Sequence, residues 1–133
     1  MLLKKPMEPL KAVLVTEDDE SLLNVLKEKL SDIGLMVYTA KNGQEGLFIA
    51  KAKMPNIILL DILMPKLDGL KMLEELRKLN DWGKSVPVII LSNLDADDEI
   101  LSHVVKDQPS YYFIKSDVSL EDIVGKIKEL LKL

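Results

Sequence analysis

The sequence predicts an α/β fold in which a parallel β-sheet is covered by helices on both faces. Short apolar runs, typical of strands buried on both faces, alternate with longer segments whose apolar residues recur at helical spacing. The chain has 133 residues, about the size of one domain. Such alternation favours a parallel sheet, because right-handed crossover helices return the chain to the same end of the sheet each time.

Five strands are expected to alternate with five helices. The expected strands are residues 12–15, 36–40, 57–60, 88–91 and 111–114. The expected helices lie within residues 22–33, 44–54, 70–79, 100–105 and 120–131, and residues 80–87 form a polar connection. Gly34 should end the first helix in a left-handed conformation, and Ser119 should cap the last. In the second helix, Leu47, Ala50 and Met54 share the expected buried face.

Composition excludes several classes of function. The chain has no cysteine and one histidine, His103, which excludes disulfide frameworks, thiol nucleophiles and ordinary zinc sites. A net charge of −4 lacks the basic footprint of a nucleic-acid binder, so no direct nucleic-acid binding is expected. Without a secretory signal or a run of about 20 apolar residues, the chain should be cytoplasmic and should not insert into a membrane.

Polar side chains follow four of the expected strands directly. They are Glu17 and Asp18, Asp61, Ser92 and Lys115, after the first, third, fourth and fifth strands. In an open α/β sheet, ligands bind beyond the carboxyl ends of the strands. Three carboxylates, a hydroxyl and an ammonium at this edge therefore indicate a binding site. Asp19 and Glu20 have a simpler interpretation, as acids favoured at a helix N-terminus.

The acidic residues among them suit a divalent metal. Three carboxylates close together repel one another, so they take up protons or hold a cation. Glu17, Asp18 and Asp61 offer only oxygen ligands, which favours a hard ion and most of all Mg²⁺. The metal would neutralise an incoming phosphate, and Ser92 and Lys115 would bind its oxygens. The pattern suits phosphoryl transfer to a carboxylate.

Four segments in a matching order give the chain a family resemblance. They are residues 13–19 (VLVTEDD), 60–69 (LDILMPKLDG), 90–93 (ILSN) and 112–115 (YFIK). Through them the chain resembles the CheY-like receiver domain of two-component response regulators. The resemblance implies a flavodoxin-like (βα)5 doubly wound sheet of order 2-1-3-4-5. It covers residues 11–133 as the receiver domain and leaves residues 1–10 as an N-terminal leader.

The resemblance also implies the roles of the acidic residues. Asp61 is similar to the phosphoacceptor of the family. Asp18 resembles the direct metal ligand, and Glu17 resembles its neighbour that acts through water. The backbone carbonyl of Leu63 would be a further metal ligand. Together these groups would hold Mg²⁺ beside the acceptor.

Three further residues resemble the family's switch. Ser92 corresponds to the hydroxyl that moves toward the phosphoryl group, Tyr112 to the aromatic residue that swings inward, and Lys115 to the lysine that pairs with a phosphoryl oxygen. Ser116 departs from the family pattern, which has proline after the lysine, often in a cis peptide. Without proline a cis bond costs about 2.5–4 kcal/mol, so we expect a trans bond here.

The implied function is a signalling switch in a phosphorelay. A sensor histidine kinase or phosphotransfer protein would donate the phosphoryl group. The domain would catalyse only its own phosphorylation and dephosphorylation. A downstream protein partner would bind the face made by the fourth helix, the fifth strand and the fifth helix.

Two other functions compete with this interpretation. A degenerate receiver would act only as a protein interaction module, which the complete set of phosphorylation residues disfavours. A hydrolase of the haloacid dehalogenase type also uses an aspartate after a strand. That class needs a second aspartate two residues later, where this chain has Leu63.

The lifetime of the phosphorylated state is the first testable prediction. In receivers, the side chains two positions beyond the acceptor and beyond the switch hydroxyl flank the attacking water; here they are Leu63 and Leu94. Neither can orient water by hydrogen bonding, so hydrolysis should be slow. Leu63→Asn and Leu94→Glu, singly and combined, should lose phosphate faster than wild type. Equal rates in all four proteins would contradict this explanation.

Overall fold

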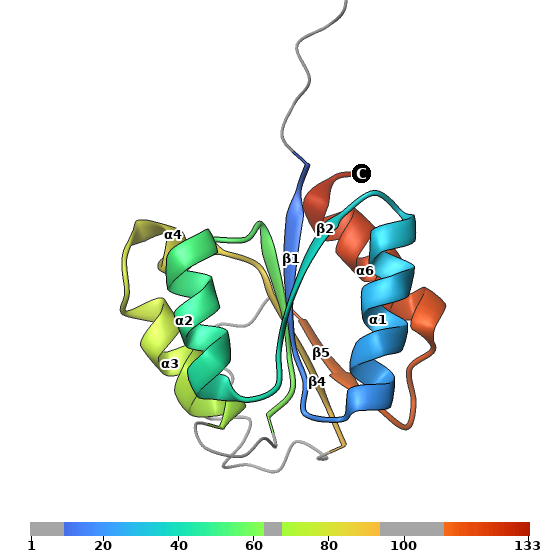
Figure 1. Ribbon diagram of the computed structural model, residues 1–133, viewed down its shortest axis with the longest axis horizontal. Coiled ribbons are helices and arrows are strands. Elements are labelled where there is room, and N and C mark those ends of the chain that lie inside the picture. Colours follow the sequence, from blue (N-terminus) through green and yellow to red (C-terminus); the bar gives the residue numbers. More distant parts are fainter. Residues whose placement is uncertain (1–9, 63–67, 94–110) are drawn as a thin grey trace, which may run out of the picture.

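The computed structural model describes residues 10–62, 68–93 and 111–133 (Figure 1). Its strands and helices follow the expected alternation along the chain. They are β1 Ala12–Thr16, α1 Glu20–Asp32, β2 Met36–Ala40, α2 Gly43–Lys53, β3 Ile57–Leu60, α3 Gly69–Arg77, α4 Asp81–Ser85, β4 Val88–Ser92, β5 Tyr111–Ile114 and α6 Leu120–Leu131. The helix expected around residues 100–105 and most of the leader lie outside the described residues.

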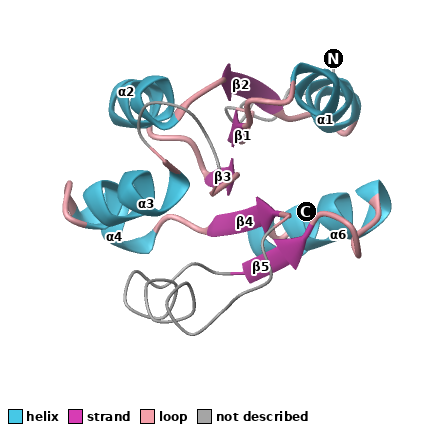
Figure 2. Cartoon of the chain, turned by 90° about the horizontal axis from the view of Figure 1, so that it is seen from below, coloured by secondary structure: helices cyan, strands magenta, loops and turns pink. Residues whose placement is uncertain are grey.

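The five strands form one parallel sheet in the order β2-β1-β3-β4-β5, which confirms the predicted order. Helices α1 and α6 lie on one face of the sheet, and α2, α3 and α4 lie on the other (Figures 1 and 2). Within the described ranges, no helix has the length and apolarity needed to span a bilayer.

The sheet is buried on both faces because successive side chains of its strands point into two separate cores. In β1, Val13 and Val15 pack with α1 and α6, whereas Leu14 between them packs with α2 and α3. The central strands β3 and β4 alternate in the same way, and each of their nine residues is buried. This double burial explains why these strands read as continuous apolar runs in the sequence.

Capping residues mark the helix ends. The side chain of Asp19 accepts a hydrogen bond from Leu22 N–H at the start of α1, and Gly34 follows the end of that helix with φ +93°. Ser119 and Asp122 form a reciprocal capping box on α6. These three features confirm the sequence predictions. The face predicted for Met54 is wrong, because this residue ends α2 in a left-handed conformation and is 52% exposed.

The segment predicted as a polar connection contains the short helix α4. Asn80 caps it by accepting a hydrogen bond from Gly83 N–H at 2.7 Å. Trp82 anchors it, because its indole N–H donates to the carbonyl of Pro55 at 3.0 Å. Arg77 at the end of α3 donates to two carbonyls of the same segment, those of Gly83 and Val86. These tertiary hydrogen bonds stabilise a helix too short to be stable by itself.

The start of α3 packs directly against the backbone that leaves β3. Gly69 N–H donates to the carbonyl of Ile62 at 2.9 Å. A Cβ atom on Gly69 would lie 2.1 Å from the carbonyl oxygen of Asp61 and 2.7 Å from Cα of Ile62. Only glycine allows this approach, which holds α3 beside Asp61.

The second testable prediction concerns this contact. Gly69→Ala should lower the free energy of unfolding by about 1–3 kcal/mol, because backbone atoms must move to accept the methyl group. Gly125→Ala is the matched control, since Gly125 is exposed on α6 with no atom within 4 Å of its Cβ position. That variant should gain about 0.5–1 kcal/mol from helix propensity. Urea unfolding measures both, and equal stabilities would refute the packing argument.

Candidate functional site

The carboxyl ends of β1 and β3 bring the predicted acidic residues together. Backbone hydrogen bonds align these strand ends: Asp61 N–H donates to the Thr16 carbonyl at 3.0 Å, and Glu17 N–H donates to the Ala40 carbonyl at 2.9 Å. Each acidic residue therefore leaves the sheet at the same edge. The sequence argument from strand ends predicted this placement.

The carboxylates of Glu17, Asp18 and Asp61 form one cluster. Each contributes an oxygen atom, and these oxygens all lie within 4.8 Å of one another. Glu17 and Asp61 are only 2% and 5% exposed, whereas Asp18 is exposed to solvent. Water therefore screens the charges of Glu17 and Asp61 poorly, and their repulsion must be balanced within the protein.

Lys115 supplies this balance. Its Nζ lies 2.6 Å from Oε1 of Glu17 and 3.1 Å from Oδ2 of Asp61. The lysine reaches the cluster because β5 ends beside β4, where Lys115 N–H donates to the carbonyl of Ser92 at 2.8 Å. One ammonium thus contacts two buried carboxylates.

The ionisation of Glu17 and Lys115 reflects this environment. Burial raises the pKa of Glu17 to about 7; the Asp61 charge adds to the rise, and the hydrogen bonds from Lys115 and from Asp19 N–H oppose it. Burial by itself would lower the pKa of Lys115, but its contacts with Glu17 and Asp61 outweigh burial and raise that pKa above its ordinary value. Lys115 therefore stays charged at neutral pH, whereas Glu17 gains or loses its proton near pH 7.

The cluster fits a small hard cation. All of its donors are carboxylate oxygens, the ligand type that Mg²⁺ prefers. Two oxygens bound to one Mg²⁺ lie at most about 4.2 Å apart. The oxygens here lie within 4.8 Å of one another, and a bridging water would extend the reach of a carboxylate. Leu63, whose backbone carbonyl was predicted as a further ligand, lies outside the described residues.

Of the predicted switch residues, Lys115 contacts the cluster, whereas Ser92 and Tyr112 lie on β4 and β5. Ser92 is fully buried at the end of β4. Strand register pairs Leu60 with Ile90, so Asp61 and Ser92 follow this pair on neighbouring strands. Tyr112 lies one strand further out, half-buried against the core formed with α2 and α3, and does not belong to the carboxylate cluster.

Sequence reasoning missed two backbone contributions. Asp19 was interpreted only as a helix-terminus residue, and its side chain does cap α1. Its N–H, however, donates to Oε2 of Glu17 at 3.0 Å and so orients that carboxylate. Gly69 has no structural role in the sequence analysis beyond its place in the 60–69 segment, although its missing side chain lets α3 reach the Asp61 backbone. The first signal is visible in the sequence as a helix cap two residues after an acid; the second depends on tertiary packing.

Comparison with known proteins identifies the class. The family model described as response regulator receiver domain matches residues 13–128, so the chain belongs to the response regulator receiver domain family, whose members act in two-component signalling. A probable transcriptional regulator ycf27 of Cyanophora paradoxa is 43% identical over 123 residues, which are 92% of this chain and 48% of the relative.

Solved structures agree with this assignment. The receiver domain of the Francisella response regulator 1452 is 32% identical, with a TM-score of 0.81 over 92% of this chain and 97% of that chain. A CheY-like receiver domain protein of Methanospirillum hungatei is 28% identical, with a TM-score of 0.85 over 93% of this chain and 95% of that chain. The chain spans between 32% and 50% of the length of the curated relatives it matches. The complete acidic cluster gives no support to a degenerate receiver.

The third testable prediction concerns pH and metal. In metal-free protein, folded Glu17 keeps its proton up to about pH 7, whereas the unfolded chain releases it near its ordinary pKa of 4.5. The folded state therefore binds more protons between these values, and stability falls as pH rises through this window. At about 1.4 kcal/mol for each pKa unit, the loss is of the order of 3 kcal/mol.

Urea unfolding with a chelator between pH 4.5 and 8 measures this loss, and Glu17→Gln should lack it. At pH 8, Mg²⁺ should raise the melting temperature of wild type in a concentration-dependent way, because it binds only the folded site. Asp18→Ala should weaken that response. The same pH dependence in wild type and Glu17→Gln, or an undiminished Mg²⁺ response in Asp18→Ala, would contradict the assignment.

Proposed function

We propose that this domain takes a phosphoryl group onto Asp61 and thereby switches the binding of a protein partner. The donor is a sensor histidine kinase or a phosphotransfer protein. One observation carries the proposal: a buried carboxylate at the end of β3 lies within reach of two further carboxylates and 3.1 Å from a lysine ammonium. Receiver family membership supports the same reaction class.

The chain's own residues divide the work of the transfer. An oxygen of the Asp61 carboxylate attacks the phosphorus atom of a phosphohistidine; a P–O bond forms, the P–N bond breaks, and the imidazole leaves with the electron pair. Glu17, Asp18, Asp61 and the carbonyl predicted for Leu63 would hold Mg²⁺, which would neutralise charge on the phosphoryl oxygens. No separate base is needed, since a carboxylate oxygen attacks without giving up a proton.

The switch follows from where the new charge lies. Lys115 turns from the Asp61 carboxylate to a phosphoryl oxygen, and the hydroxyl of Ser92 donates to another. Tyr112 then moves inward beside Ser92. The phosphoryl group shifts a pre-existing equilibrium only because it contacts one arrangement of these residues better than the other.

The partner face comprises β5, α6 and the helix expected around residues 100–105, which lies outside the described residues. We further propose that the domain acts in the cytoplasm and that it binds no nucleic acid directly, in line with its net charge of −4. In this role it is a signalling switch whose only reactions are its own phosphorylation and dephosphorylation.

The fourth testable prediction identifies the acceptor. With Mg²⁺ and a small acyl phosphate, wild type should gain one phosphoryl mass, and Asp61→Asn should gain none. Asp19→Asn is the matched control, because asparagine caps a helix as well as aspartate and the Asp19 side chain lies outside the cluster. Intact mass spectrometry measures all three proteins with and without a chelator. Labelling of Asp61→Asn, or labelling that a chelator leaves unchanged, would place the reaction elsewhere.

A further inference from the structure

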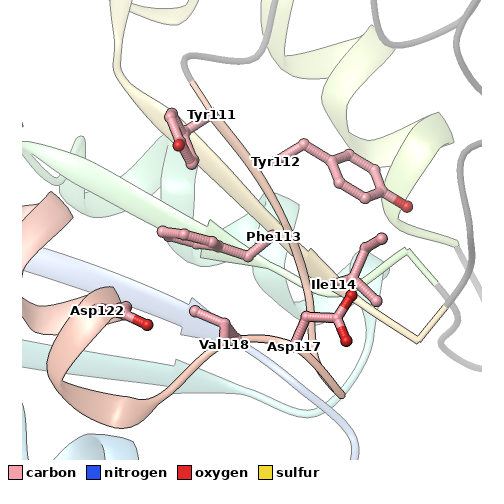
Figure 3. A pocket seen from close by; sticks show the side chains of 7 residues that line it. All are labelled: Tyr111, Tyr112, Phe113, Ile114, Asp117, Val118 and Asp122. Carbon is pink, nitrogen blue, oxygen red and sulfur yellow. The ribbon is translucent and has the colours of Figure 1, made fainter.

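A shallow pocket lies beside the edge strand β5. None of its lining residues belongs to the acidic cluster. It has a volume of about 220 Å³ and is lined by β5 and by the start of α6 (Figure 3). Strand β5 is the last strand of the sheet, so this pocket lies at the sheet's outer boundary. Aromatic rings and carboxylates dominate its lining, a combination different from that of the phosphorylation site.

The aromatic part comes from alternate residues of β5. The rings of Tyr111 and Phe113 lie on the same side of the strand, with centroids 4.7 Å apart and planes tilted by 53° (Figure 3). Tyr111 is 41% exposed, a large exposure for an aromatic residue on a strand. Its ring already attracts a cation, because Nζ of Lys126 lies 4.1 Å from the ring centroid.

The acidic part comes from Asp117 and Asp122, which flank Val118 in the view of Figure 3. Asp122 Oδ2 accepts a hydrogen bond from Ser119 N–H in the capping box. Among the described residues, no hydrogen bond or ion pair reaches the carboxylate of Asp117. Neither nearby lysine pairs with these aspartates. Lys115 pairs with Glu17 and Asp61, and Lys126, which lies over the Tyr111 ring, pairs with Glu129 at 2.6 Å.

From this combination we infer that the pocket receives an arginine side chain of a protein partner. Both carboxylates are exposed, and neither forms an ion pair with a lysine among the described residues, so both are open to a cation from outside. A guanidinium group fits better than an ammonium, because it stacks on aromatic rings and donates two parallel hydrogen bonds to a carboxylate. The inference rests on the proposed partner-binding function and names the chemistry that the partner must present.

The fifth testable prediction uses a short blocked peptide with one central arginine as the probe. A second peptide carries citrulline, which has nearly the same shape without the charge. In amide NMR titrations, the arginine peptide should shift resonances of residues 111–114 and 117–122, and the citrulline peptide should not. Asp117→Asn should weaken binding by about threefold, in the range of a partly exposed charge pair. Glu121→Gln, which removes the same charge beside the pocket, should bind as wild type does.

Three outcomes would overturn the inference: equal binding of the citrulline peptide, shifts confined to other surfaces, or equal losses in Asp117→Asn and Glu121→Gln. The titration needs no phosphoryl group, so Asp61→Asn, which cannot be phosphorylated, should still bind the arginine peptide. The titration therefore tests arginine binding at the pocket, whereas intact mass spectrometry independently tests phosphorylation of Asp61.

Discussion

The crowding of like charges at the carboxyl edge of the sheet is the constraint on which the rest of this structure depends. Three carboxylates share the edge with one ammonium, and two of the carboxylates are almost fully buried. Lys115 balances part of the charge, and removal of a partner from such a buried arrangement leaves an uncompensated charge that is costly. Because the balance is incomplete, the site fits a cation, which the proposed phosphoryl transfer requires.

Such a site requires a rigid frame, and the two cores provide one. Each central strand is buried on both faces, so its carboxyl end cannot shift without disturbing the packing of α1 and α6 on one side or of α2 and α3 on the other. Gly69 adds a backbone contact that fixes α3 beside Asp61. The two apolar cores therefore fix the positions of the polar residues at this edge, and the polar residues alone provide the chemistry.

Strand positions and the acidic cluster could be predicted from the sequence because both depend on short-range patterns. Apolar runs define β1, β3 and β4, and a parallel sheet necessarily brings Glu17 and Asp61 to one edge. Helix α4 escaped prediction because hydrogen bonds from distant residues such as Arg77 hold it. Met54 was misplaced because helical spacing does not show where a helix ends. The bond between Lys115 and Glu17 also depends on how β5 lies beside β4, which no local pattern specifies.

Lys115 links the acidic cluster to the pocket proposed as an arginine site beside β5. Its ammonium lies in the acidic cluster, its N–H is fixed to the end of β4, and Asp117 at the pocket follows only two residues later. Under the two proposals, a phosphoryl group on Asp61 would draw the ammonium away and would thus act on the same short segment as an arginine bound beside β5. If this segment has two arrangements, both ligands bias one equilibrium, and this shared element is the physical basis of coupling. Linkage then requires the effect to be reciprocal: to the extent that phosphorylation strengthens partner binding, the bound partner stabilises the phosphorylated state by the same factor.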